Sequence, residues 1–227
     1  KPAAFLDCFL RWTQSLRGAV AHEIVALDGK ALRRATRRGQ SPRYVISAWA
    51  QSNGLVLGQL KVADKSNEIT ALPQLLRALE LAGCIVTVDA MGCQKAIAKE
   101  IIEADADYVL ALKGNQETVH EEVQSYLDDA IVRQAQAPAR KASVKSVPEL
   151  AHTETVEKDH GRLEIRRYWQ SGRLDWFADR AKWEGLRSVG VVESVRQVGA
   201  AEPTVERRYC LSSLAVDVAQ FARAVRG

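Results

Sequence analysis

The sequence predicts an α/β fold: a mixed sheet with flanking helices and a β-rich insertion. Three observations support this prediction. Short apolar or β-branched runs alternate with stretches of helical period up to Ile131. Ser52-Asn53-Gly54 lies between two strand-like runs, which is typical of a β-hairpin. Beyond Ile131 the chain turns polar, basic and Pro-containing, and strand-like runs then return.

The predicted elements follow one another in a simple order. The first part should contain strands at 23–28, 44–51 and 55–62, a helix at 68–83, a strand at 84–89, a helix at 94–104, a strand at 107–113 and a helix at 117–127. The second part should contain strands at 152–158, 163–169, 189–198 and 207–211, and a helix from Ser213 onward. Three strands with tight connections that lead into alternating helices and strands are the order of the ribonuclease-H-like fold, which is therefore the predicted fold class.

Four segments are expected from this order. Residues 1–22 form an amphipathic helix, the tail of a missing N-terminal domain or a linker helix. A ribonuclease-H-like catalytic core spans 23–142, the β-rich insertion spans 143–211, and 212–227 begin a truncated C-terminal catalytic helix. The chain starts at Lys1 and stops inside a helical pattern, so we expect a fragment of a longer protein.

Composition excludes several classes of protein. The 227 residues are 47% hydrophobic and 26% charged with a net charge of +4, which is ordinary for a globular protein. No apolar run approaches the roughly 18 residues of a membrane span, and no secretory signal is visible. Four cysteines without a CxxC pair argue against a structural zinc site and for reduced thiols in a cytoplasmic protein.

Two aspartates, Asp28 and Asp89, stand at the ends of the first and fourth predicted strands. These strands lie side by side in a ribonuclease-H-like sheet, so the fold would bring both carboxylates together. Mg²⁺ and Mn²⁺ prefer such oxygen ligands, and two ions about 3.5–4 Å apart can activate a water or a 3′-hydroxyl for phosphoryl transfer. The alternative for Asp89 is a structural cap on the segment that follows it.

Six blocks of the sequence also carry a family resemblance: VALDGKALR, DKSNEITALPQLL, TVDAMGCQKAIA, DYVLALKGNQ, HGRLEIRRY and RYCLSSL. In this order they resemble insertion-sequence transposases of the DDE type, specifically the H-repeat-associated group. The resemblance implies that Asp28 and Asp89 are the first two acids of the catalytic triad, with Mg²⁺ or Mn²⁺ as cofactor. It also implies cleavage and strand transfer on double-stranded DNA at transposon ends and target, a homodimer, and a nucleoid-associated protein in the cytoplasm.

The third acid of the triad has three possible positions. The helix after the fifth strand offers Glu117, Glu121 and Glu122, which equally suit a solvated face. Glu164 lies in a segment that alternates like a strand, whereas the family places this glutamate on a helix. We favour the third position, a glutamate beyond Gly227 that follows the β-rich insertion.

Basic and polar residues near the predicted metal site are candidates for binding DNA. They are Lys30, Arg33, Arg34, Arg37 and Arg38 after the first strand, Lys113 and Asn115 after the fifth, and Arg162 and Arg166 in the insertion. Without DNA binding, the same residues would be solvent-exposed surface charges and, for Asn115, a helix cap.

Two other functions are compatible with the same fold. A ribonuclease-H-like nuclease would cleave DNA without joining it, and an inactive truncated relic would bind DNA without cleaving it. A metabolic α/β enzyme is disfavoured because no Gly-rich phosphate loop follows the first strand.

Overall fold

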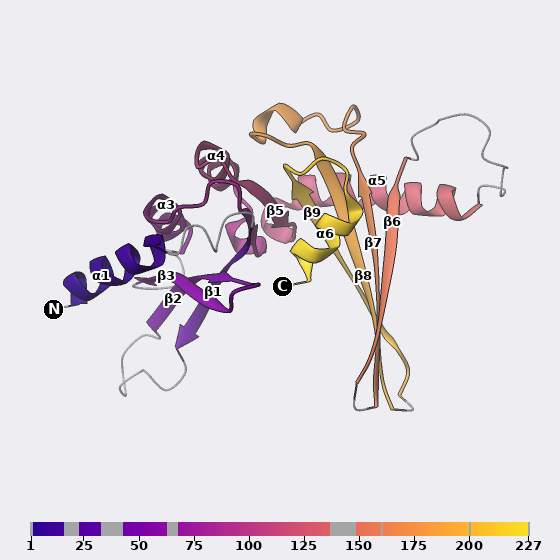
Figure 1. Cartoon of the computed structure of the whole chain (residues 1–227). Coiled ribbons are helices and arrows are strands. Elements are labelled where there is room, and N and C mark those ends of the chain that lie inside the picture. The colour runs from indigo at the N-terminus through magenta and orange to yellow at the C-terminus, as the bar shows by residue number, and fades with distance from the viewer. Residues whose placement is uncertain are drawn as a thin grey trace. The chain divides into compact units, whose positions relative to one another are not determined.

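The computed structural model describes residues 2–15, 23–32, 43–62, 68–136, 149–159, 161–199 and 201–226. It divides into two compact units. The first contains residues 1–110 and 183–185, and the second contains residues 111–182 and 186–226. Figure 1 shows the helices and strands of both.

The first unit is a five-stranded mixed sheet with helices. Its elements are α1 (Pro2–Ser15), β1 (Ile24–Leu32), β2 (Arg43–Ala50), β3 (Leu55–Val62), α3 (Glu68–Ala78), β4 (Ile85–Val88), η2 (Ala90–Gly92), α4 (Lys95–Glu103) and β5 (Asp107–Ala111). The strands follow the order β3-β2-β1-β4-β5. The pairs β1–β2 and β2–β3 are antiparallel, whereas β1–β4 and β4–β5 are parallel. A meander with β1 beside β4 is the ribonuclease-H-like arrangement, so the predicted fold class is confirmed.

The central strands owe their position to their apolar side chains. Val25 and Val86, which are partners in the register of β1 and β4, are fully buried, and Leu110 is fully buried in β5. The predicted hairpin forms between β2 and β3, and its Gly54 takes a φ of 62°, which glycine tolerates. Glu23, only 5% exposed, accepts hydrogen bonds from the Ser52 amide and the Asn53 side chain, which fixes this turn beside β1.

Residues 183–185 belong to this first unit although they come late in the chain. Trp183 is 2% exposed, and the Lys95 ammonium lies 5.9 Å from the centre of its ring. The Tyr108 hydroxyl donates a hydrogen bond of 2.9 Å to the Glu184 carbonyl. Burial raises the pKa of Tyr108 far above its usual value, so the phenol stays a hydrogen-bond donor at neutral pH.

The second unit is an antiparallel four-stranded sheet with a helix on each face. Its elements are η3 (Gly114–Gln116), α5 (Glu117–Gln136), β6 (Ala151–Asp159), β7 (Arg162–Ser171), η4 (Arg180–Lys182), β8 (Ser188–Val198), β9 (Thr204–Ser212) and α6 (Val218–Val225). Its strands follow the order β9-β8-β7-β6. On one face, Asp128 of α5 accepts hydrogen bonds from Arg207 and Tyr209. On the other, Phe221 of α6 packs where Gly190 has no side chain.

Several predicted boundaries are wrong in detail. β1 continues past Asp28 to Leu32 because it still pairs with β2 there. α5 extends to Gln136 rather than Leu127, since Ala130 continues its buried stripe. α3 ends at Ala78, and α6 begins at Val218 rather than near Ser213. Asp217 starts α6 by accepting hydrogen bonds from the amides of Ala219 and Gln220.

Candidate metal centre

The strand register brings Asp28 and Asp89 to neighbouring positions. β1 and β4 run parallel, and their last paired residues are Leu27 and Val88. Asp28 directly follows Leu27, and Asp89 directly follows Val88, at the point where the parallel pairing of β1 and β4 ends. Adjacent strands lie about 4.8 Å apart, so the backbones that carry the two acids are near neighbours.

Strand alternation gives the face of the sheet on which Asp28 lies. Side chains alternate along a strand, so Asp28 shares the face of Ala26, and Ala26 pairs with Thr87 of β4. Asp89 comes two residues after Thr87 and keeps an extended backbone, with φ −67° and ψ 173°. Asp89 itself lies one residue beyond β4 and lines the hollow beside Leu27 and Leu72. The strand order places the two acids after neighbouring strands, and their role as one metal site stays a prediction.

Asp89 is also a cap, as the alternative interpretation held. Its Oδ1 accepts hydrogen bonds from the amides of Met91 and Gly92, at 3.2 and 3.5 Å. Oδ2 accepts none from any residue that the structure describes. One oxygen thus holds the short helix η2, and the other has no hydrogen-bond donor among the residues that the structure describes.

The loop after Asp89 is tightly packed against the sheet. A Cβ on Gly92 would lie 2.2 Å from Val88 Cγ1 and 3.0 Å from Leu72 Cδ1, so only glycine fits without a shift. A small hollow adjoins the loop, and Leu27, Gly29, Ile46, Leu72 and Asp89 are among its lining residues. This packing fixes the backbone that carries Asp89.

Asp28 has a cationic neighbour on its own strand. Lys30 Nζ lies 2.9 Å from Asp28 Oδ2, and 47% of the Asp28 side chain is exposed. The hydrogen bond to Asp28, and then its charge, raise the pKa of Lys30 above its usual value. Lys30 therefore remains an ammonium group beside the candidate metal ligand.

The third carboxylate is not identified by the structure. Within the described ranges, no group of three His, Cys, Asp or Glu side chains is placed to hold a metal ion. Glu117 and Glu121 are exposed on α5, Glu122 is half-buried there, and Glu164 lies on strand β7 in contact with two arginines. A glutamate beyond Gly227 stays a prediction.

The predicted DNA-binding residues are distributed over both units. Lys113 and Asn115 are exposed and follow β5, where Lys113 precedes η3. Arg162 and Arg166 lie on β7 and both contact Glu164. Arg33, Arg34, Arg37 and Arg38 lie outside the described residues.

Comparison with known proteins identifies the family. Residues 20–210 match the family described as "Transposase DDE domain". A Xanthobacter autotrophicus protein named "Uncharacterized protein in dhlA 3'region" is 39% identical over 95% of this chain and 69% of its own length. The Escherichia coli K12 "H repeat-associated putative transposase YhhI" is 37% identical over 99% of this chain and 58% of its own length. This chain therefore belongs to the DDE transposase family, within the H-repeat-associated group.

Two further findings complete the comparison. A chain from the structure of a piggyBac transposase synaptic complex with hairpin DNA aligns with 91% of this chain, at a TM-score of 0.41 and 10% identity. The alignment covers 37% of the length of the piggyBac chain. The chain spans little more than half of YhhI, at 58% of its length. No helix in the described part of the chain is long and apolar enough to cross a membrane.

Proposed function

We propose that this chain is part of a transposase that cleaves DNA at insertion-sequence ends and transfers the strand to a target, with Mg²⁺ or Mn²⁺ as cofactor. The observation that carries the proposal is the position of Asp28 and Asp89. Two acids that are distant in sequence directly follow the last paired residues of the parallel strands β1 and β4. Family membership independently supports DNA as the substrate class.

The residues present fit a hard divalent cation. Asp28 is half exposed and Asp89 keeps Oδ2 available among the described residues, and Mg²⁺ is usually held by one or two carboxylates with waters and phosphate oxygens. When bound, the metal would supply Lewis-acid activation of a water or 3′-hydroxyl and stabilisation of the leaving oxygen. The tight packing at Gly92 would hold Asp89 in place for that task.

Lys30 has a distinct part in this proposal. It neutralises Asp28 while no metal is bound, because the two side chains form an ion pair. Occupation of Asp28 by a metal would free the ammonium to hold a DNA phosphate. Lys113, Asn115 and the arginines of residues 33–38 would position further phosphates, with Arg162 and Arg166 on the insertion. We also propose a homodimer that works on chromosomal DNA in the cytoplasm.

Calorimetric titration with Mn²⁺ tests the metal site. The variants are Asp28→Asn and Asp89→Asn, which remove one charge each and keep the side-chain volume. Asp105→Asn is the matched control, because Asp105 is exposed and has a positive φ of 54°, which asparagine tolerates. We expect Mn²⁺ binding to be lost in both site variants and kept in the control.

Binding that survives both site variants would contradict the proposal and leave Asp89 as a cap alone. A strand-transfer assay with a pre-cut transposon end then separates a transposase from a nuclease, since a nuclease releases product without joining it. A protein that binds DNA and neither cleaves nor joins it with any divalent metal would be an inactive relic.

A further inference from the structure

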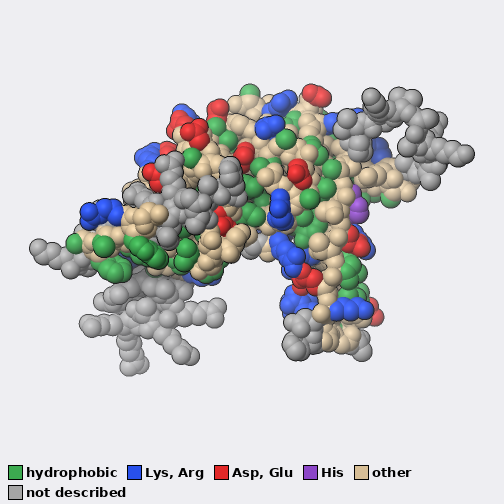
Figure 2. Space-filling view, in the orientation of Figure 1, with side chains coloured by type: hydrophobic (Ala, Val, Ile, Leu, Met, Phe, Trp, Pro, Cys, Tyr) green, Lys and Arg blue, Asp and Glu red, His purple; other side chains and the backbone are tan. Residues whose placement is uncertain are grey.

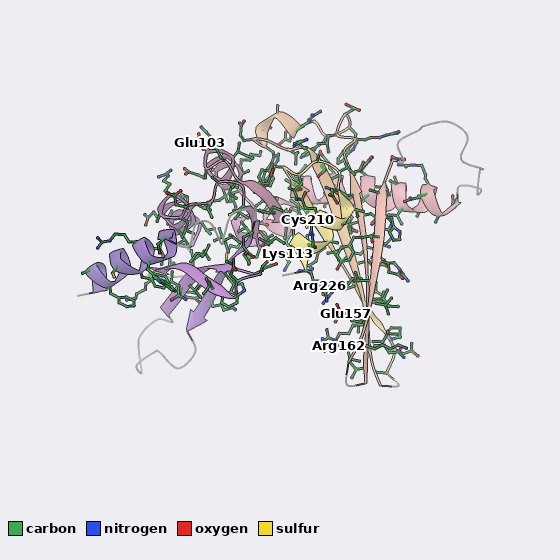
Figure 3. The ribbon with its side chains drawn as sticks, in the orientation of Figure 1. Glu103, Lys113, Glu157, Arg162, Cys210 and Arg226 are labelled. Atoms are coloured by element: carbon green, nitrogen blue, oxygen red, sulfur yellow. The ribbon has the colours of Figure 1, made fainter. Side chains whose placement is uncertain are left out.

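Four arginines gather on one face of the sheet in the second unit, the face that carries α6. This arginine cluster consists of Arg162, Arg166, Arg196 and Arg226, around Glu157 and Glu164. Figure 2 shows basic and acidic side chains close together along these strands, and Figure 3 labels Arg162, Glu157 and Arg226 on the same side. Only two of the four, Arg162 and Arg166, stand out in the sequence.

Strand register explains why the cluster forms. Glu157, Glu164 and Arg196 are directly opposite one another on β6, β7 and β8. Arg162 and Arg166 flank Glu164 at two residues' distance, so alternation puts them on its face. Arg226 directly follows α6 and reaches Glu157. The four arginines thus come from β7, β8 and the end of α6, and the glutamates between them come from β6 and β7.

The two glutamates hold the guanidinium groups in place. The Glu164 side chain is 11% exposed, and its two carboxylate oxygens bind Arg162 and Arg166 separately. The Arg166 Nη2–Glu164 Oε1 distance is 2.5 Å, and Arg166 Nη1 lies 3.7 Å from Glu157 Oε2. Arg226 contacts the other oxygen of Glu157. Side chains fixed in this way lose little conformational entropy when they bind a ligand.

The arginine cluster keeps excess charge and unused donors. Four arginines and two glutamates carry a formal charge of about +2, and Asp159, Glu206 and Arg208, which the register puts on the same face, reduce it to about +1. Arg196 is exposed and has no ion-pair partner in the part of the chain that the structure describes. Arg162 Nε and Thr155 Oγ1 are buried and have no hydrogen-bond partner among the described residues. The Arg196 guanidinium is exposed, so an anionic oxygen of a ligand can reach it.

We propose that the arginine cluster binds the phosphodiester backbone of DNA. The identity of the ligand rests on the proposed function, while the site rests on the contacts above. A flat strand surface suits an extended polyanion better than a small anion, which takes a concave pocket. In this assignment Glu164 is a positioning residue for two arginines rather than the third metal ligand.

The test measures DNA binding by the whole chain over a range of salt concentrations, by fluorescence anisotropy with a labelled duplex. The variants are Arg196→Gln, Arg226→Gln and the double variant. Arg133→Gln is the matched control: Arg133 lies on α5, across the sheet, and pairs with Glu149. Its side chain is 55% exposed, close to the 51% of Arg226. All three substitutions remove one positive charge.

Log affinity falls as log salt rises, and we expect this slope to become shallower by about 1 for each substituted cluster arginine and by about 2 in the double variant. Arg133→Gln should keep the wild-type slope, and Arg196→Lys, which keeps the charge, should restore it. Thermal melting confirms that each variant is folded.

Two results would overturn the site, and they differ in what else they remove. If wild type binds DNA and the cluster variants match Arg133→Gln, the arginine cluster is not a DNA site and the proposed function stands. If wild type shows no salt-dependent binding to DNA, both the site and the proposed function fall.

Discussion

Glu193→Gln should destabilise the second unit, because Glu193 is the centre of a ladder of alternating charges. Glu154, Arg167, Glu193 and Arg207 lie opposite one another across β6, β7, β8 and β9, on the face that α5 covers. Glu193 is 7% exposed. It accepts hydrogen bonds from Arg167 at 3.0 Å and from Arg207 Nε and Nη2 at 2.8 and 2.7 Å.

The magnitude follows from these contacts. Removing one partner of a buried ion pair costs about 3–5 kcal/mol. Both arginines keep a second acid, Glu154 for Arg167 and Asp128 for Arg207, and their side chains are 38% and 35% exposed. Solvent and these remaining partners reduce the cost, so we expect a loss of about 2–3 kcal/mol.

Hydrogen exchange measures this loss in the second unit alone. At 1.36 kcal/mol per tenfold change, the amides of β8 and β9 should exchange about 30- to 160-fold faster in Glu193→Gln. The control is Glu154→Gln, the same substitution at the exposed end of the ladder, where the side chain is 40% exposed. We expect it to cost less than about 1 kcal/mol. Equal exchange rates in the two variants would refute the assignment of Glu193 as the centre of the ladder.

Three further outcomes are expected. Burial alone would raise the pKa of Glu193, but hydrogen bonds from Arg207 and Arg167 outweigh it and hold the pKa below the usual 4.5. The resulting stabilisation is complete above about pH 4.5 and is lost as pH falls through the lower folded-state pKa. The melting temperature should therefore drop more steeply with falling pH in wild type than in Glu193→Gln. Gly190→Ala should lower the free energy of unfolding by about 1–3 kcal/mol in denaturant melts, because its Cβ would lie 2.5 Å from Phe221 Cζ. Adding Phe221→Leu should recover part of that loss, and a single variant as stable as wild type would contradict the packing. Gly92→Ala should weaken Mn²⁺ binding in calorimetry because its Cβ would displace the loop that holds Asp89, and unchanged binding would show that the loop position is unimportant.

The fold was largely predictable because its signals are local. Apolar runs mark β1 and β4, and Asn53-Gly54 marks the β2–β3 hairpin, so neighbouring residues suffice to predict them. Element ends were less predictable. α5 continues beyond Leu127 because Ala130 is buried, and burial depends on what packs against the helix.

Only part of the candidate metal site could be predicted from the sequence. Topology indicated that Asp28 and Asp89 converge, but the cap that Asp89 forms with Met91 and Gly92 required the loop conformation. The sequence also left both interpretations of Asp89 open. The structure shows the cap, which uses a single carboxylate oxygen, and the metal-ligand role stays a proposal.

The sequence by itself determined which residues form the central strands and that two aspartates end up beside each other. Only the tertiary structure decided which charges meet: Glu193 with Arg167 and Arg207, and Glu164 with the arginine cluster. The physical reason is that alternation along a strand fixes the face of a side chain but not its partner. The partner depends on strand register and on helix docking, which are set by contacts between residues far apart in the chain.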